Sequence, residues 1–342
     1  MSFTLGLQAT TRCNLQCAHC YLDRVGSDLD LAVLERIIEY GRLLGDVFLG
    51  LTGGEPTLHP EFPRLARMLG ESGLKFGFVS NGWSFVEQYP ALRPYREGIL
   101  RQEFSLDGSG PELHDLTRRP GSFERLLQAA SVCRADDVPV GFRTTVTRAN
   151  LDDVEQIALL ASKLGAEALT LIPLMPTPPM AALGRLLEPE DLHRLTGDAE
   201  RLRAAFRLDV KLAVGPQGPE LLAPCPTLAM RSLFIDANGL VRFCCQVTGH
   251  AAAPDQDEPL ADLKEVTLPE AHRIAMATVT EFLMQKLRRL ERGELSEMDR
   301  FPCWYCLKHF GLMDWIGDLP ESGWAEDLRA SRQTVRARGG RQ

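Results

Sequence analysis

The chain has 342 residues, of which 44% are hydrophobic and 25% charged, and its formal net charge is −8. This composition is typical of a globular protein with one large domain and a smaller one, and the acidic balance argues against a general nucleic-acid binder. No apolar run approaches the length of a membrane span, and the N-terminus lacks the basic region and cleavage site of a signal peptide. We therefore expect a cytoplasmic chain, in which nine cysteines indicate metal ligands rather than disulfides.

Strand-like and helix-like segments alternate through the first two-thirds of the chain. We expect strands over 3–10, 46–51, 75–80, 99–106, 139–147 and 168–173, and helices over 29–44, 61–72, 85–95, 121–134, 151–164 and 188–206. Ser27 is expected to cap the first helix. Six such repeats predict a parallel sheet with right-handed crossovers. Polar motifs follow several of the strands, at the ends where barrel-like folds place their sites.

Three cysteines, Cys13, Cys17 and Cys20, lie within eight residues directly after the first strand. A loop this short can direct three sulfurs at one centre, as thiolates do around an iron–sulfur cube. Three thiolates bind only three of the four irons, so the fourth iron is left for a small chelating ligand. Zinc is the alternative, although zinc sites usually pair two close ligands with two distant ones.

This C-x3-C-x2-C loop resembles the cluster loop of the radical S-adenosylmethionine (SAM) enzymes. Gly53-Gly54-Glu55-Pro56, after the second strand, is similar to the GGEP motif of that family, whose backbone and glutamate receive the SAM amino group. Two glycines also allow a close backbone approach. Asn81, at the end of the third strand, is a further candidate for a contact with the ligand.

The fourth strand ends in a second motif with a family counterpart. Ser105-Leu106-Asp107-Gly108, followed by His114-Asp115 and Arg118, resembles the SLDG and HD..R stretch of SPASM-type radical SAM proteins. The resemblance assigns the SAM carboxylate and ribose to Ser105 and Arg118. One extra residue in the intervening loop leaves Arg119 as an alternative to Arg118. An arginine suits a carboxylate because its fork binds both oxygens.

Polar and apolar residues alternate along this fourth strand. Arg101, Glu103, Ser105 and Asp107 share one face. A polar inner face suits a barrel that binds a polar substrate, and a half-exposed edge strand is the alternative. Glu103 and Asp107 are candidates for a general base.

The last third carries a second cysteine pattern. A β-hairpin is expected over 232–245, with Asn238-Gly239 at its turn. Cys225 precedes the hairpin, Cys244 ends it, and Cys303 and Cys306 follow as C-x2-C, which together is a metal-site pattern. This spacing is similar to that of SPASM and twitch domains, and the lack of cysteines after Cys306 implies the shorter twitch version with one auxiliary [4Fe–4S] cluster. Zinc is again the alternative.

Cys245 directly follows Cys244, and neighbours in a strand point to opposite faces. Cys245 is therefore expected to be either a buried structural thiol or a hydrogen-atom donor to a substrate radical.

The resemblance implies a partial (β/α)6 TIM-like barrel over 1–206 and a small α+β twitch domain over 207–312. A C-terminal extension over 313–342 ends in a basic tail. The implied cofactors are two [4Fe–4S] clusters and SAM, and the implied partners are an external electron donor, such as flavodoxin or ferredoxin, and a small-molecule or peptide substrate. No membrane or nucleic-acid partner is expected.

The implied activity is reductive cleavage of SAM to a 5′-deoxyadenosyl radical, which takes a hydrogen atom from the substrate. Oxidation of the substrate radical through the auxiliary cluster would follow. Two alternatives stay open. One is a redox-neutral epimerase that uses Cys245, and the other is a non-catalytic metal-binding scaffold.

Overall fold

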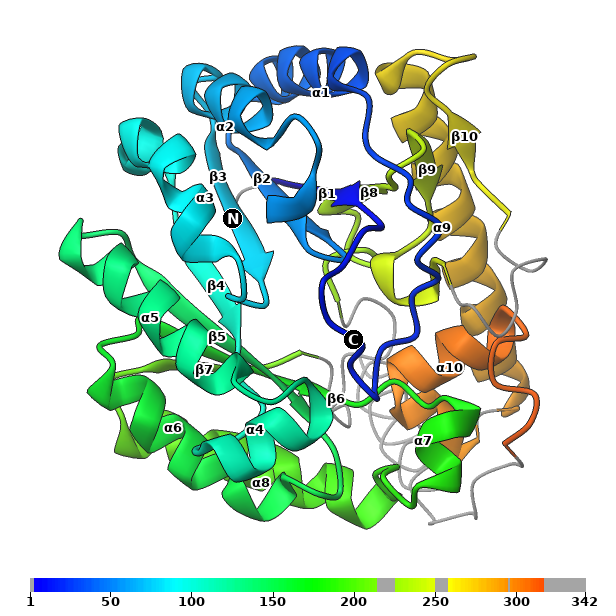
Figure 1. Cartoon of the computed structure of the whole chain (residues 1–342). Coiled ribbons are helices and arrows are strands. Elements are labelled where there is room, and N and C mark those ends of the chain that lie inside the picture. Colours follow the sequence, from blue (N-terminus) through cyan, green and yellow to red (C-terminus); the bar gives the residue numbers. More distant parts are fainter. Residues whose placement is uncertain (1–2, 214–224, 250–257, 295, 317–342) are drawn as a thin grey trace, which may run out of the picture.

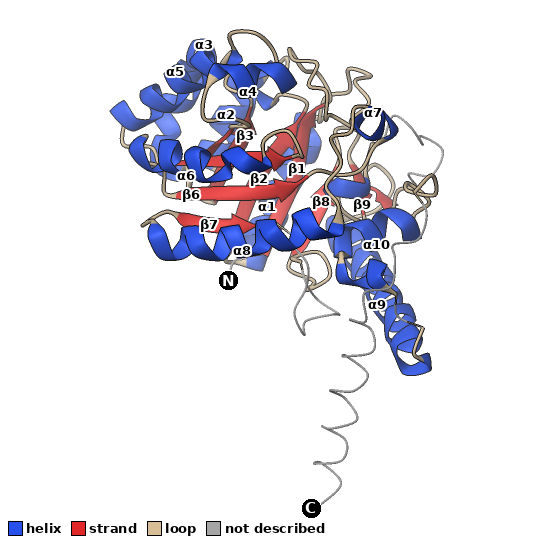
Figure 2. Cartoon of the chain, turned by 90° about the horizontal axis from the view of Figure 1, so that it is seen from below, coloured by secondary structure: helices blue, strands red, loops and turns tan. Residues whose placement is uncertain are grey.

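The computed structural model describes residues 3–213, 225–249, 258–294 and 296–316. The basic C-terminal tail lies outside these residues. Within them, ten strands form one sheet in the order β10-β9-β8-β1-β2-β3-β4-β5-β6-β7. The strands curve around an open inner side, and most of the connecting helices lie on the outer side (Figures 1 and 2).

Seven strands run parallel and neighbour one another in chain order. They are β1 (Phe3–Thr10), β2 (Val47–Gly53), β3 (Lys75–Ser80), β4 (Gln102–Ser105), β5 (Val140–Val146), β6 (Ala168–Pro173) and β7 (Asp209–Leu212). The helices between them are α1 (Leu31–Leu44), α2 (Phe62–Glu71), α3 (Phe85–Leu92), α5 (Ser122–Ala135), α6 (Val154–Lys163) and α8 (Pro189–Ala205). Two shorter helices, α4 (Pro111–Thr117) and α7 (Pro178–Ala182), lie in the connections after β4 and β6.

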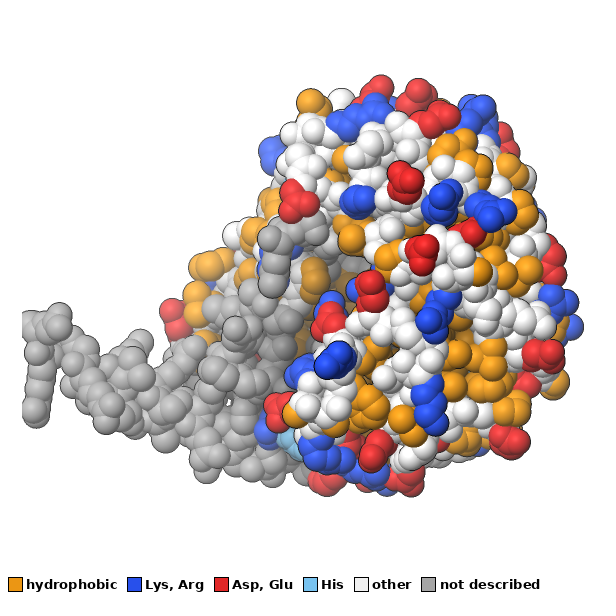
Figure 3. Space-filling model, turned by 90° about the vertical axis from the view of Figure 1, so that its left-hand side faces the viewer, with side chains coloured by type: hydrophobic (Ala, Val, Ile, Leu, Met, Phe, Trp, Pro, Cys, Tyr) orange, Lys and Arg blue, Asp and Glu red, His pale blue; other side chains and the backbone are white. Residues whose placement is uncertain are grey.

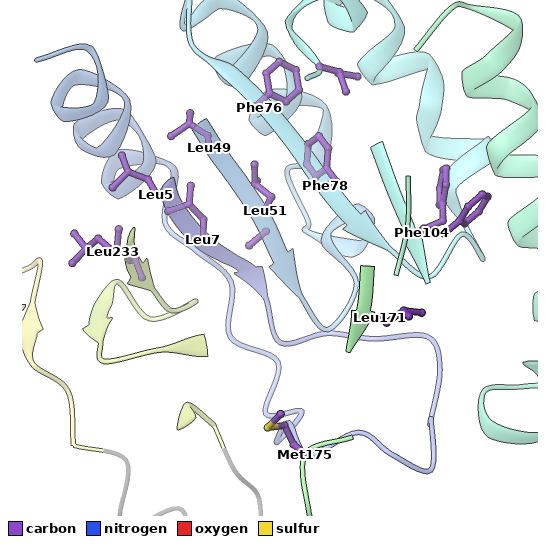
Figure 4. Close-up of a cluster of buried hydrophobic side chains, with 14 of the residues drawn as sticks. Leu5, Leu7, Leu49, Leu51, Phe76, Phe78, Phe104, Leu171, Met175 and Leu233 are labelled. Carbon is purple, nitrogen blue, oxygen red and sulfur yellow. The ribbon is translucent and has the colours of Figure 1, made fainter. Parts of the chain in front are cut away.

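Alternating apolar side chains of adjacent strands build the core between sheet and helices. Leu5 of β1 is in register with Leu49 of β2, and Leu49 with Phe76 of β3. Leu7, Leu51 and Phe78 form the next row in the same way. All six are buried on one side of the sheet (Figure 4). The other set of strand residues is thereby directed to the inner side.

The sheet continues beyond residue 206, where the first expected domain ends. β7 pairs with β6, and β8 (Ser232–Ile235) pairs in parallel with β1. β9 (Leu240–Arg242) forms the expected hairpin with β8, and β10 (Ala261–Asp262) adds an antiparallel edge. The two parts of the chain therefore share one hydrogen-bonded sheet.

Two helices of the last third were not expected from the sequence. α9 (Leu268–Arg292) packs against α1, where Tyr40 Oη lies 2.7 Å from His272 Nδ1. α10 (Pro302–His309) carries both cysteines of the C-x2-C pair. The expected cap of α1 is also wrong, because Asp30 caps that helix by accepting from the Ala32 N–H at 2.8 Å.

The surface carries both signs of charge. Acidic and basic side chains are interspersed on the face shown in Figure 3. Among the helices that the structure describes, none combines the length and apolarity needed to cross a bilayer.

Candidate cofactor site and four-cysteine cluster

The cysteine loop after β1 is closed at its base by two threonines. Thr11 Oγ1 accepts hydrogen bonds from the Gly26 and Ser27 N–H groups at 2.9 and 2.8 Å. Thr10 Oγ1 donates to Asp28 Oδ1 at 2.6 Å. Residues 11–28 therefore form a closed loop, which crosses the inner side of the sheet (Figure 1).

The backbone at the end of β2 holds this loop in place, and two glycines allow the close approach. The Gly54 N–H donates to Thr10 O at 2.8 Å, and the Glu55 N–H donates to Arg12 O at 2.7 Å. A Cβ on either Gly53 or Gly54 would clash with the backbone of Thr10 or Arg12, and Gly53 has φ +150°. The glycines thus allow the cysteine loop itself to approach, in addition to any ligand.

One cavity of about 200 Å³ unites most of the residues predicted from separate motifs. It is lined by the predicted residues Cys13, Cys17, Cys20, Gly53, Gly54, Asn81, Ser105 and Arg118. It is also lined by residues that were not predicted as ligand contacts, including Tyr21, Leu22, Arg24, Thr52 and Val79. Tyr21 and Leu22 directly follow Cys20 and Arg24 comes two residues later, so their closeness to the cysteine loop is the signal that could have identified them.

Glu55 does not belong to the cavity lining, and its side chain is fully buried. Oε1 accepts from Thr57 Oγ1 at 2.7 Å and from Ser80 Oγ at 2.9 Å, and Oε2 accepts from the Asn81 N–H at 2.7 Å. Burial raises the pKa of Glu55, and these hydrogen bonds oppose that effect. In this structure Glu55 ties the end of β2 to the end of β3.

Arg118, rather than Arg119, faces the cavity. Its Nε donates to Asp107 Oδ2 at 2.6 Å, and its Nη1 lies 3.9 Å from Cys17 Sγ. Arg119 instead stacks on Trp83, 4.2 Å from the ring centroid.

Asp107 is almost fully buried and is paired on both oxygens, since Oδ1 also accepts from the Thr145 N–H at 2.8 Å. Burial alone would raise the pKa of Asp107, but the Arg118 guanidinium and nearby imidazoles outweigh it and hold the pKa below its usual value. Asp107 is therefore an ionised anchor for Arg118.

His19 lies between the cysteines and Asp107. Its Nε2 is 3.9 Å from Asp107 Oδ2, and burial lowers the pKa of His19 to about 4, so its ring is neutral. Nδ1 is buried and has no hydrogen-bond partner within the described residues. An orphaned nitrogen, three thiols and an arginine on one cavity fit an iron–sulfur cluster with a polar chelating ligand.

Glu103 lies deeper on the same face of β4. Arg143 Nε and Nη2 lie 2.6 Å from Glu103 Oε2, and Arg101 Nη2 lies 3.3 Å from Oε1. The candidate base is thus engaged by two arginines.

Four cysteines from three segments line a second, apolar cavity. They are Cys225, Cys244, Cys303 and Cys306, with Leu228, Phe243 and Val247 among their neighbours. Cys303 and Cys306 lie on the first turns of α10, three residues apart and therefore on one face. Backbone N–H groups of Leu228 and Gln246 lie 3.5 Å from the sulfurs of Cys225 and Cys244.

Burial raises the pKa of the Cys225, Cys303 and Cys306 thiols. Four thiols clustered in an apolar environment, with N–H donors on two of them, fit the ligand set of a metal–thiolate centre. In the described ranges, no group of three or more His, Cys, Asp or Glu side chains converges on the position of a single metal ion.

Cys245 is not part of a strand, contrary to the sequence-based expectation. β9 ends at Arg242, and Cys245 begins the 3-10 turn Cys245–Val247. A hydrogen bond with Cys244 lowers the pKa of the Cys245 thiol, burial opposes it, and the Arg143 guanidinium adds to the lowering. Cys245 therefore lies directly beside Cys244 of the second cysteine cluster and within electrostatic reach of Arg143.

Tyr21 connects the two cysteine sites. Its hydroxyl lies 3.1 Å from Cys245 O and 3.2 Å from Gln246 Oε1. The Asp23 N–H donates to Gly249 O at 3.0 Å. The N-terminal loop and the segment after the hairpin are thus in direct contact.

Comparison with known proteins gives one family match and several relatives. The sequence model of the radical SAM superfamily matches residues 7–161. An AdoMet-dependent heme synthase of Methanosarcina barkeri is 34% identical over 179 residues, which are 50% of each chain. A PqqA peptide cyclase of Ruegeria pomeroyi is 31% identical over 169 residues, 47% of this chain and 44% of the cyclase. The chain spans about half the length of the curated relatives it matches.

Solved structures share the fold. Streptococcus suis SuiB bound to S-adenosylmethionine has a TM-score of 0.62 at 15% identity, over 80% of this chain and 64% of SuiB. The structure described as native anSMEcpe with bound AdoMet has a TM-score of 0.59 at 18% identity, over 78% of this chain and 80% of that one. The α/β fold class with a partial barrel is confirmed.

Proposed function

Residues 7–161 form a radical SAM domain with homologues among SPASM-type enzymes, and from this we propose that the chain is a radical SAM enzyme with an auxiliary cluster. One observation carries the proposal. The cysteine loop, the glycine pair, Ser105 and Arg118 were predicted from separate motifs and line one cavity. A non-catalytic scaffold has no need for that convergence.

Cys13, Cys17 and Cys20 would hold the first cluster. With SAM bound, that cluster would supply the electron for reductive cleavage of SAM and so give the site its radical chemistry. The chain's own residues would bind and orient SAM and the substrate, and would exclude water from the site. Asp107 engages Nε of Arg118, and Nη1 lies 3.9 Å from Cys17 Sγ, so the terminal end of the guanidinium is directed at the cysteine cavity, where it would bind the SAM carboxylate. Ser105, Asn81 and the Gly53–Gly54 backbone line the remaining wall.

Asp107 and Glu103, the two candidates for a general base, have other roles under this proposal. An ionised Asp107 with both oxygens engaged is a positioning residue, because it fixes the Arg118 fork. Glu103 is bound to Arg143 and Arg101, so it orders the inner face of β4 and β5. Neither carboxylate has a free oxygen poised for proton transfer.

Cys225, Cys244, Cys303 and Cys306 would hold the second cluster. Four thiolates occupy all four irons, so side chains rather than this cluster would hold the substrate. A cluster held there would be able to accept one electron, which favours net oxidation of the substrate as the outcome. The substrate would lie between the two cysteine sites, where Arg143, Cys245 and Tyr21 meet.

Substrate class and partners extend this proposal. A cyclase of the peptide PqqA is among the relatives, and SuiB has been solved with its precursor peptide SuiA. We propose a peptide or a small molecule as substrate, and an external one-electron donor of the flavodoxin or ferredoxin type. The barrel (1–206), the twitch-like part (207–312) and the extension (313–342) would be the functional units.

The test uses the full-length chain reconstituted anaerobically with iron and sulfide. We expect about eight irons per chain and formation of 5′-deoxyadenosine when dithionite and SAM are added. Cys20→Ala should abolish the 5′-deoxyadenosine. Full iron loading without any SAM cleavage would contradict the proposal and favour the scaffold.

The second candidate function is an epimerase, which the position of Cys245 beside Arg143 favours. Cys245→Ala should keep about eight irons, because Cys245 is outside the four-ligand set, whereas Cys244→Ala should lose about half of them. Iron analysis of both variants checks this. Solvent deuterium in the product of the wild type, lost in Cys245→Ala, would establish the epimerase, and its absence in both supports oxidation.

A further inference from the structure

Lys286 lies on the buried face of α9, which is otherwise apolar. Lys286 is 1% exposed and follows Ala275, Val279 and Phe282 along the buried stripe of the helix, with Leu290 after it. Burying an ammonium group is costly unless its charge is compensated. A feature of the surroundings must therefore account for this lysine.

The carboxylate of Asp299, which acts on Lys286, is already paired with Arg289. Asp299 is buried and accepts from Arg289 Nη1 and Nη2 at 2.9 and 3.2 Å, and from the Ser296 N–H at 2.9 Å. No described carboxylate lies within ion-pair distance of Lys286 Nζ. Its nearest aromatic contact is Tyr305, whose ring centroid is 4.6 Å away, and Arg289 shares that ring at 5.2 Å. A ring shared with a second cation cannot neutralise the lysine.

The ammonium lies near the four-cysteine cluster. Tyr305 lies between Cys303 and Cys306 on α10, so the cation–π contact places Lys286 beside that C-x2-C turn. The Lys286 charge also opposes the effect of burial on the pKa values of Cys225 and Cys306, which places it near cysteines of two different segments. With neutral thiols, burial lowers the pKa of Lys286, and Asp299, which is already paired with Arg289, does not outweigh that effect.

We propose that Lys286 is the countercharge of the metal–thiolate centre held by Cys225, Cys244, Cys303 and Cys306, and that it raises the reduction potential of that centre. The proposal rests on the auxiliary cluster of the proposed function. Four thiolates on a [4Fe–4S] core carry net negative charge, which grows by one when the cluster is reduced. A buried positive charge nearby stabilises the reduced form more than the oxidised form.

The proposal predicts opposite effects in the loaded and the metal-free chain. Without metal, Lys286 has no counterion, so Lys286→Met should leave the melting temperature unchanged or raise it. With the cluster bound, the same substitution should favour the oxidised form. A purely structural lysine would instead lower the melting temperature when removed.

The test measures the potential of the second cluster alone. Full-length chain with alanine at Cys13, Cys17 and Cys20 is reconstituted anaerobically and titrated with a redox mediator set, with the reduced cluster followed by electron paramagnetic resonance. Lys286→Met and Lys286→Gln should each lower the equilibrium constant for reduction at least tenfold, which is about 59 mV for one electron. Lys286→Arg keeps the charge and Lys163→Met changes a lysine on the distant α6, so both should leave the potential unchanged.

The outcomes separate this inference from the proposed function. An unchanged potential in both neutral variants, at full iron occupancy, overturns the countercharge and leaves the auxiliary cluster intact. Iron lost from both neutral variants, with an unchanged or higher melting temperature of the metal-free chain, supports it. Wild-type chain that binds only about four irons, all of them lost with Cys13, Cys17 and Cys20, overturns the auxiliary cluster itself and the countercharge with it.

Discussion

Alanine at both Cys303 and Cys306 should halve the iron of the reconstituted chain, from about eight to about four atoms, and still allow 5′-deoxyadenosine formation. The two cysteines supply half of one ligand set, and both lie on one face of α10. The first cavity shares no cysteine with the second. Iron and sulfide analysis, with chromatography of the SAM products, measures both effects.

The reciprocal variant has alanine at Cys13, Cys17 and Cys20. It should also keep about four irons but form no 5′-deoxyadenosine. Cys133→Ala is the matched control, because Cys133 is buried on α5 away from both cavities and should not affect iron content. Equal loss of iron from both cysteine sets in either variant would show that the two sites are not separate centres.

Asp107→Asn should destabilise the metal-free chain by about 3 kcal/mol or more. The substitution leaves the buried Arg118 guanidinium without its counterion, while the amide oxygen can still accept from the Thr145 N–H. Arg118 should then lose its fixed orientation, so SAM should also bind more weakly to the reconstituted variant. Urea unfolding and SAM titration measure the two effects.

The matched control is Glu87→Gln, which breaks the exposed ion pair between Glu87 and Arg125 at 2.7 Å. That pair should be worth less than about 1 kcal/mol. The pKa of Asp107 is lowered in the folded chain, so its contribution is fully present above the unfolded pKa of about 4 and is lost as the pH falls through the lower folded value. Wild type and Asp107→Asn should therefore converge in stability only in that acidic range. A difference below 1 kcal/mol at pH 7 would contradict the anchoring role.

Local patterns predicted much of the barrel and most of the cavity. The period-two alternation in 3–10 and 75–80 and the helical stripe in 151–164 are properties of short segments, so the sequence shows them directly. The motifs after β1, β2 and β4 converge because parallel strands end at one edge of a sheet.

Features that depend on distant partners were not predictable in this way. Glu55 is not part of the cavity lining and is satisfied by donors from Ser80, at the end of β3, and from Asn81 directly after it, and no pattern near Glu55 indicates those donors. The pairing of β8 with β1 and the turn at Cys245 likewise depend on tertiary contacts.

The sequence does contain start and stop signals for the long helix α9. Thr267 caps it, Pro269 lies in its first turn, and Gly293 ends it with φ +73°. These are ordinary start and stop residues for a helix. The apolar stripe between them is interrupted by Lys286, which weakens the periodic pattern.

The pairing of β8 with β1 has a consequence for how the protein is made. During synthesis, β1 leaves the ribosome before β2 and can pair with it early, but the other edge of β1 has no native partner until β8 has emerged, more than 200 residues after β1. An unpaired edge of alternating leucines invites intermolecular pairing. The nascent chain should therefore depend on chaperones until the hairpin is complete, and a chain truncated after residue 206 should aggregate where the full chain does not.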